Sequence, residues 1–391
     1  MKSRVGAILA LFVGFLISLP AGAQTTTSSI VGSVSDENGP LADAIVTAVY
    51  VPTGMQYHGF TNAKGSYRIN GVVAGGPYNI RVELMGYRTM VMSDVTAPLG
   101  DRVELDFELK MTSTSLDEIV VVDQATHSNM NVQNSGASTN ITNSVLMATP
   151  TASRSLYDVM RLTPQSISTT RGFMVGGGDY RSSSVTVDGA SFNNAFGIGS
   201  SLPAGGNPLS LDAIDQISVS ITPFDVRHSG FKGGAINMVT KQGGNEWHAS
   251  LYDYYNSSWL RGRHLGDVAL PQSNTLNNVA GFTLSGPIVK DKLFFFLNAE
   301  YTPEKVPGAS AQARADSNAA WGGNGYNRPT VGRMDSIRNY LIKEYGYDPG
   351  RYQNYSVDAS DYRFLARLDW IINSNNKFNV RFSHKIGRAH V

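Results

Sequence analysis

Residues 293–301 read LFFFLNAEY, and their side chains alternate between two kinds. The first set is apolar or aromatic throughout: Leu293, Phe295, Leu297, Ala299, Tyr301. The second set begins with two aromatic residues and then turns polar: Phe294, Phe296, Asn298, Glu300. Because successive side chains of a strand point to opposite faces, this stretch predicts a β-strand with one apolar and one mostly polar face. The wall of a membrane β-barrel requires strands of this kind.

The same alternation recurs four times around this stretch, in residues 247–255 (WHASLYDYY), 278–286 (NVAGFTLSG), 362–371 (YRFLARLDWI) and 377–385 (KFNVRFSHK). The gaps are 257–275, 287–291, 303–360 and 373–376, so they alternate between long and short. Outer-membrane barrels have short periplasmic turns and long extracellular loops. The alternative is a soluble sandwich with uneven loops, although very long loops without structure of their own are uncommon there.

Aromatic residues near the ends of these stretches suit the girdles that flank the apolar band of a barrel. They are Trp247, Tyr254, Tyr255, Tyr301, Tyr362 and Trp370.

The composition favours an exported, β-rich protein and argues against an enzyme. The chain has 391 residues, a net charge of +1, only 16% charged residues, 40 glycines and no cysteine. It has no basic stripe, so nothing favours nucleic acid as a partner. The lack of cysteine excludes disulfides, thiolate metal sites and a lipid-modified N-terminal cysteine. The seven histidines are scattered and no HExxH or GxSxG motif occurs, so we expect no catalytic residue, no metal site and no cofactor.

The N-terminus has the features of a secretory signal peptide over residues 1–23. Lys2 and Arg4 precede an apolar run, residues 5–19, and the segment AGA at 21–23 is a small-residue cleavage site. The alternative is a membrane-anchor helix, for which the apolar run is short. We therefore expect the mature chain to begin near Gln24.

Residues 24–112 predict an immunoglobulin-like β-sandwich. Short alternating stretches are separated by turn residues, such as 38–40 (NGP) and 63–65 (AKG). The stretches on either side of AKG are expected to pair with each other. In the last stretch, residues 102–111, four apolar side chains are expected on one face: Val103, Leu105, Phe107, Leu109.

Residues 125–245 predict an α+β domain with glycine-rich connections. A short helix is expected in SRSLYDVMRLTPQ, residues 153–165, capped by Ser153 or Ser155. Its apolar side would consist of Leu156, Val159, Met160 and Leu162. A strand is expected to end in a turn at Asp188-Gly189.

Residues 117–122, DEIVVV, stand out between these two domains because polar, turn-prone chain surrounds them. Such an apolar, β-prone run is expected either to pack in a core or to be captured by a partner.

The sandwich resembles the carboxypeptidase-regulatory-like domain in residues such as Gly32, Val34, Asp36, Gly65 and Tyr67. The whole mature chain resembles the TonB-dependent outer-membrane receptors of the Bacteroidetes type, especially the Oar-like branch, with SusC-like transporters as neighbours. The stretches ASRSLYDVMRLTPQ, SSVTVDGASFNNAFG and LSLDAIDQISVSITPFDVRHSGFKGGAINMVTKQGGN carry this resemblance.

The resemblance implies a mainly β protein of the Gram-negative outer membrane. Residues 125–245 would be its plug domain, and residues 246–385 the first strands of a transmembrane β-barrel of about 22 strands. Residues 113–124 would be the TonB-box linker, with a site that binds TonB: Asp117, Glu118, Ile119, Val120, Val121, Val122. The alternative is that this run forms the last strand of the sandwich or a plug strand.

The implied function is energised uptake of a large nutrient that the sequence does not identify. The implied partners are TonB with ExbB and ExbD, outer-membrane lipid and, as in the SusC-like branch, a SusD-like lipoprotein. Surface adhesion or protein export on the same scaffold is the alternative function.

Five strands cannot close around a plug, and open sheet edges do not face lipid. We therefore expect the chain to be a C-terminally truncated receptor. The alternation stops after Lys385, and residues 386–391 (IGRAHV) match one reading frame of a common sequencing adapter. We expect this hexapeptide to be non-native.

Overall fold

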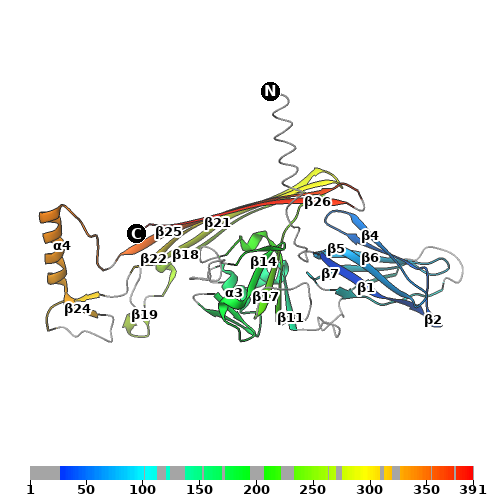
Figure 1. The fold of residues 1–391 in the computed structure, drawn as a ribbon, viewed down its shortest axis with the longest axis horizontal. Coiled ribbons are helices and arrows are strands. Elements are labelled where there is room, and N and C mark those ends of the chain that lie inside the picture. Colours follow the sequence, from blue (N-terminus) through cyan, green and yellow to red (C-terminus); the bar gives the residue numbers. More distant parts are fainter. Residues whose placement is uncertain are drawn as a thin grey trace, which may run out of the picture.

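A computed structural model describes residues 27–100, 102–111, 120–123, 137–151, 154–169, 172–193, 207–221, 233–262, 264–269, 275–308, 312–318, 326–353, 355–373 and 376–390. Three bodies follow one another along the chain (Figure 1): a β-sandwich, a smaller α+β body and a long, gently curved sheet. The α+β body lies beneath one face of the long sheet, and the sandwich lies beside one end of that sheet.

The N-terminal body is a sandwich of two five-stranded sheets, as predicted. The first sheet contains β1 (Thr27–Asp36), β2 (Gly39–Pro40), β5 (Ser66–Val73), β8 (Arg102–Glu104) and β9 (Phe107–Glu108). The second has the order β10-β7-β6-β3-β4, with β3 (Ile45–Tyr50), β4 (Met55–Phe60), β6 (Gly75–Glu83), β7 (Met90–Ala97) and β10 (Val120–Asp123).

One pairing within the sandwich was predicted wrongly. The two strands around the AKG turn, β4 and β5, belong to different sheets: β4 pairs with β3, and β5 pairs with β1. The turn therefore crosses between the layers, which allows both strands to bury alternate side chains in one shared core. The face predicted for residues 102–111 is correct, since Leu105, Phe107 and Leu109 are at most 2% exposed and Val103 packs against the core.

The α+β body is built on the sheet β11-β16-β17-β14-β15. Its strands are β11 (Ala137–Thr142), β14 (Ser184–Val187), β15 (Ala190–Ser191), β16 (Ile214–Ile221) and β17 (Gly234–Thr240). The helices α2 (Asn143–Ala148) and α3 (Leu156–Met160), the hairpin β12 (Ser166–Thr169) with β13 (Gly172–Val175), and two short 3-10 helices, Tyr180–Ser182 and Leu211–Ala213, complete this body.

The predicted helix of this body is present, but it is shorter than the stretch of apolar residues that predicted it. Ser155 is its N-cap, and the Ser155 hydroxyl accepts a hydrogen bond from the backbone N–H of Tyr157. Leu156, Val159 and Met160 are fully buried. Leu162 was assigned to the apolar side wrongly: it is 39% exposed because the helix ends at Met160.

The long sheet contains the five predicted strands in antiparallel sequence order. They are β18 (His248–Ser257), β21 (Leu276–Val289), β22 (Leu293–Pro307), β25 (Ser356–Ile371) and β26 (Lys377–His390). The expected loss of pattern after Lys385 does not end the strand, since β26 stays in register with β25 through Asp358↔His390. We call this sheet the wall.

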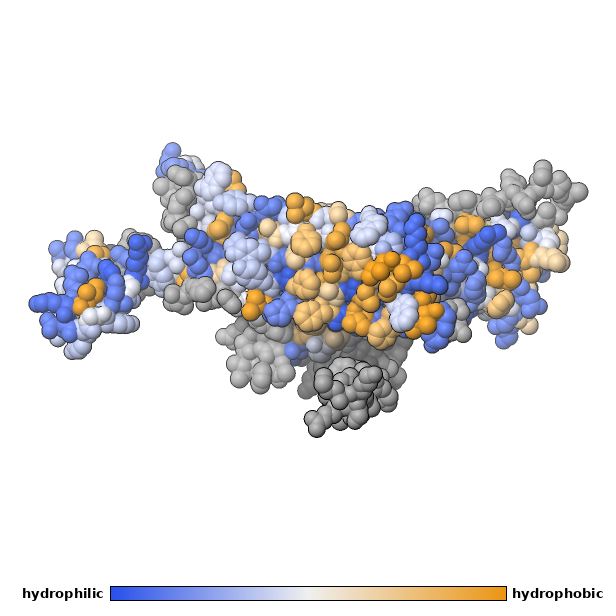
Figure 2. Space-filling view, turned by 90° about the horizontal axis from the view of Figure 1, so that it is seen from above, coloured by the Kyte–Doolittle hydropathy of each residue, from blue (hydrophilic) through white to orange (hydrophobic). Residues whose placement is uncertain are grey.

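The two faces of the wall differ as the alternation predicted. The face turned away from the α+β body is exposed and apolar, with Leu251, Phe282, Phe364, Val380 and Phe382 between 38% and 88% exposed. Figure 2 shows an apolar band across this face, with more hydrophilic surface toward both ends. On the opposite face Phe294, Phe296, Asn298 and Glu300 are at most 5% exposed.

Loop lengths also alternate as predicted. The short turns, 290–292 and 372–376, lie at the sandwich end of the wall, and the long loops, 258–275 and 308–355, lie at the other end (Figure 1). The long loops carry β19 (His264–Leu265), β20 (Val268–Ala269), β23 (Gln312–Arg314), β24 (Tyr326–Thr330), α4 (Val331–Tyr345) and a 3-10 helix, Ser258–Leu260. Within the described residues, no helix is both long enough and apolar enough to span a membrane.

Candidate functional site

Part of the DEIVVV segment forms an edge strand of the sandwich. The residues Val120 to Asp123 pair in parallel with β7, in the register Val120↔Met90 to Asp123↔Ser93. This matches the alternative in which the run is the last sandwich strand. Asp117, Glu118 and Ile119 lie outside the described residues, so the TonB-binding role of the six residues stays a prediction.

A buried carboxylate of the wall, Glu300, forms the first polar contact with the α+β body. Its side chain is 2% exposed and accepts hydrogen bonds from the hydroxyls of Ser210 at 2.6 Å and Tyr252 at 3.0 Å. Arg363 on the neighbouring strand forms an ion pair with Glu300. Because Ser210 precedes the 3-10 helix Leu211–Ala213, this contact fixes the entrance to β16 against the wall.

A second contact joins the loop before α3 to the same region. Arg154 forms an ion pair with Asp212, and its guanidinium lies over the Tyr254 ring at 4.1 Å from the centroid. Burial raises the pKa of Asp212, while the Arg154 charge acts in the opposite direction. Asn207 supports this loop by accepting from Leu156 N and donating to the Arg154 carbonyl, both at 2.7 Å.

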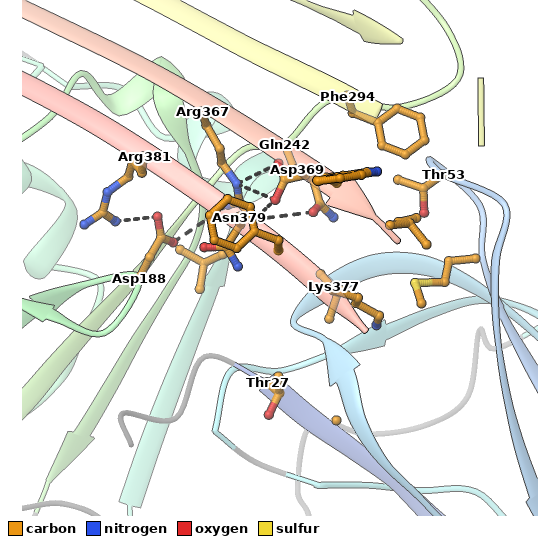
Figure 3. A pocket seen from close by; sticks show the side chains of 17 residues that line it. Thr27, Thr53, Asp188, Gln242, Phe294, Arg367, Asp369, Lys377, Asn379 and Arg381 are labelled. Atoms are coloured by element: carbon orange, nitrogen blue, oxygen red, sulfur yellow. Dashed lines mark hydrogen bonds and ion pairs between the residues drawn. The ribbon is translucent and has the colours of Figure 1, made fainter. Parts of the chain in front are cut away.

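The predicted turn at Asp188-Gly189 provides the third contact. Asp188 has φ +43°, and its carboxylate accepts from the Thr240 N–H at 2.8 Å and the Thr240 hydroxyl at 2.6 Å. Figure 3 shows Asp188 facing Arg381 of β26, its ion-pair partner, with Arg367 of β25 close by. Arg367 also donates to the Thr240 carbonyl at 2.8 Å. Two wall arginines therefore hold the ends of β14 and β17.

The paired glycines of the α+β body permit close packing. Gly176 and Gly177 have φ of +61° and +77° and form the turn after β13. A Cβ on Gly234 would lie 2.7 Å from the Val175 Cβ, closer than real side chains approach. Gly176 and Gly177 therefore serve a turn, and Gly234 allows β17 to pass close to Val175.

The predicted aromatic girdle is partly correct. Tyr301 and Tyr362 are cross-strand partners that stack at 4.5 Å between ring centroids and are 40% and 47% exposed. Tyr254 was assigned wrongly, because it lies under the Arg154 guanidinium on the side of the α+β body. In the described part of the chain, no group of three or more His, Asp or Glu residues could hold a metal ion.

Comparison with protein families gives two matches. Residues 29–110 match the model of the carboxypeptidase regulatory-like domain, and residues 239–390 match the outer membrane beta barrel domain. The wall is part of an outer-membrane barrel. The α+β body that lies on the inner face of this wall, residues 137–240 as described, is called the plug below.

The chain is also similar to transport proteins. It is 27% identical to the TonB-dependent transporter Oar of Myxococcus xanthus over 97% of this chain and 35% of that protein. A probable TonB-dependent siderophore receptor, PirA of Acinetobacter baumannii, is 29% identical over 32% of this chain and 15% of its own length. The crystal structure of that receptor superposes with a TM-score of 0.44 and 19% identity, covering 66% of this chain and 32% of the receptor. The chain thus spans about a third of the length of Oar.

Proposed function

We propose that this chain is the N-terminal part of an energised outer-membrane transporter of the Oar-like, Bacteroidetes type. TonB, driven by ExbB and ExbD, would capture residues 117–122 as an added β-strand and pull on the plug. The plug would then shift within the barrel and open a path for a large nutrient.

The arrangement of charges between plug and wall is the observation that carries this proposal. Asp188, Asp212 and Ser210 of the plug meet Arg381, Tyr254 and Glu300 of the wall region through hydrogen bonds, ion pairs and one bridging arginine. Each of these polar contacts can be exchanged for a contact with water, so its net contribution is only about 0.5–3 kcal/mol. An interface of this kind holds a plug at rest and still releases it under load.

Deletion of residues 117–122 tests the coupling. We expect uptake to be abolished, while insertion into the outer membrane and ligand binding at the surface remain. A matched control is deletion of residues 128–133, which shortens the polar linker by the same length and leaves DEIVVV intact. Uptake that persists without residues 117–122, or that fails equally in both deletions, would refute the coupling.

Surface adhesion or protein export is the second candidate. Hydrogen bonds between its own side chains hold the long loop 308–355 together. Arg338 donates to both carboxylate oxygens of Asp348 at 3.0 and 2.8 Å, and Tyr352 donates to Asp335 at 2.8 Å. A rigid extracellular element suits adhesion. A neighbouring gene for a SusD-like lipoprotein would favour nutrient uptake, and loss of cell–cell contact after deletion of α4 would favour adhesion.

A further inference from the structure

The sandwich contacts the plug and the wall at one end of the molecule, and Asn245 is at the centre of this contact. Its backbone N–H donates to the Pro52 carbonyl at 2.8 Å, and its side-chain amide donates to the Thr53 carbonyl at 3.0 Å. Asn245 also exchanges two hydrogen bonds with Asp291 of the β21–β22 turn, at 2.7 and 2.9 Å. One residue of the plug–wall connector thus joins the sandwich to a short turn of the wall.

The residues on either side of the β25–β26 turn make a second contact with the sandwich. Lys377 donates to the Tyr57 hydroxyl at 2.6 Å, and its ammonium lies 4.1 Å from the centroid of the Tyr57 ring. Ile371, at the end of β25, packs against the sandwich core. Both short turns of the wall are therefore tied to the same domain.

The plug sheet itself makes the third contact. Ala74 and Leu99 of the sandwich form a small buried apolar cluster with Val239 of β17. Gly75 faces the plug residue Asp215 so closely that an added Cβ would lie 2.4 Å from the Asp215 Oδ2. Because Gly75 has no side chain, the Asp215 carboxylate can occupy the space beside it.

A cavity of about 350 Å³ lies between the three bodies (Figure 3). Thr53 and Thr27 of the sandwich, Asp188 and Gln242 of the plug region, and Arg367 of the wall lie around it. Hydrogen bonds of Asn245 and Lys377 join the bodies around this cavity, together with the small apolar cluster and the packing of Ile371. Relative motion is the default expectation for two domains of one chain unless their interface is large and hydrophobic.

We propose that the sandwich is a stopper, docked on the periplasmic end of the plug, which must be released before the plug can move. This inference rests on the proposed function. Short turns are periplasmic in outer-membrane barrels, so the docked domain covers the exit side. No other domain in the described part of the chain contacts the plug sheet and both short turns together.

The length of the two tethers sets the order of events. Residues 112–116 join the coupling segment, residues 117–122, to the sandwich, and residues 123–136 join it to β11. At full extension these tethers reach about 17 and about 48 Å. A pull on the coupling segment therefore tightens the sandwich tether first, and the sandwich leaves before the load reaches the plug.

Cross-linking in the assembled receptor tests the stopper, and the 391 residues of this chain contain no cysteine of their own that would react with the cross-linker. The variant Y57C/K377C, joined by a short cleavable bismaleimide, would tie the sandwich to the wall. We expect it to link readily, to bind ligand normally and to lose uptake by about tenfold or more, with recovery after cleavage. The control I45C/F60C links two exposed partner positions within the sandwich and should leave uptake unchanged.

A second variant, Gly244→Val, undocks the sandwich without a cross-linker. A Cβ at Gly244 would lie 2.4 Å from the Pro52 carbonyl oxygen, and its three nearest atoms all belong to Pro52. We expect roughly tenfold less Y57C/K377C linking, the order of effect for an overpacked contact. Gly262→Val adds the same bulk where nothing lies within 4 Å, and it should change nothing.

The outcomes separate this inference from the proposed function. Normal uptake by the linked receptor would overturn the stopper, and so would the absence of linking in the resting receptor or equal linking in Gly244→Val. Uptake that survives deletion of residues 117–122 would instead overturn the coupling. Loss of uptake in the deletion, combined with transport by the linked receptor, would leave the transporter standing and remove only the stopper.

Discussion

Substitution of Asp188 by Asn should loosen the plug from the wall. Asn tolerates the positive φ of this position, and its carbonyl still accepts from the Thr240 N–H. The change removes the negative charge and replaces the oxygen that accepts from the Thr240 hydroxyl and Arg381 by an amide NH2. Asp188 and its partners Arg381 and Arg367 have side chains 13–19% exposed. Exposed ion pairs contribute up to about 1 kcal/mol, and breaking a fully buried one costs about 3–5 kcal/mol. For this partly buried pair we expect about 2 kcal/mol.

Hydrogen exchange of the backbone amides of β14 and β17 measures this loss. About 2 kcal/mol corresponds to roughly thirtyfold faster exchange through local opening, while the amides of β21 and β22 should stay protected. Asp348→Asn removes the same charge from an exposed loop ion pair, at 54% exposure, and is the matched control. Unchanged exchange in β14 and β17, or equal acceleration across the wall, would refute the idea that this carboxylate holds the plug.

Three further predictions concern the plug and its neighbours. Gly234→Val should destabilise the plug by about 1–3 kcal/mol, because the new Cβ collides with Val175; urea titration of the plug measures this, and no loss of stability would contradict the packing argument. Burial raises the pKa of Asp215 to about 6 from 3.8, against the opposing charges of Lys241 and Arg367. Because Gly75 of the sandwich lies against this carboxylate, docking should be strongest below about pH 4 and weaken as pH rises through 6. Asp215→Asn should abolish this pH dependence of Y57C/K377C linking, and a dependence that persists would assign it to another group. A disulfide in T142C/Q216C, which ties partner positions of β11 and β16, should block uptake and leave ligand binding intact.

The wall could be predicted almost completely from the sequence because its signal is local. Alternation of side chains along LFFFLNAEY fixes which face meets lipid, and the long and short gaps fix which end holds the turns. The observed strand order requires only that neighbours in the sequence pair as antiparallel hairpins. The same reasoning failed at Tyr254, which was assigned by its place near a strand end. It lies two residues after Tyr252 and therefore on the same, inner face of the wall.

The partners of the polar side chains could not be predicted, because a partner is set by tertiary packing. The pattern places Glu300, Arg363 and Arg367 on the inner face of the wall, yet nothing local says that Ser210 or Asp188 lies opposite. The pairing of the AKG strands failed for the same reason, since a short turn allows either a hairpin or a crossing between layers. The DEIVVV run has the same β-prone sequence whether it packs as a sandwich strand or is captured by a partner. Only the register with β7 places its last residues on the sandwich.

The part of the plug that yields first follows from where the tether joins it. Residues 124–136 lead directly into β11, which is an edge strand that pairs only with β16 in this sheet. Peeling β11 and α2 exposes the buried side chains of Ile141 and Leu146, at a cost of about 1.5–3 kcal/mol each. Moving the whole plug would in addition expose Phe296 and Leu365, the wall residues that belong to the plug core, and would break all three polar contacts.

Partial unfolding from β11 therefore requires less work than release of the plug as one body. The tie T142C/Q216C blocks this route, whereas T186C/N237C ties β14 to β17, two neighbouring strands deep in the sheet that peeling of β11 leaves together. Uptake lost in the first variant and kept in the second is the signature of peeling. Uptake kept in both variants would mean that the plug leaves whole, and the polar contacts at Asp188 and Glu300 would then set the force required.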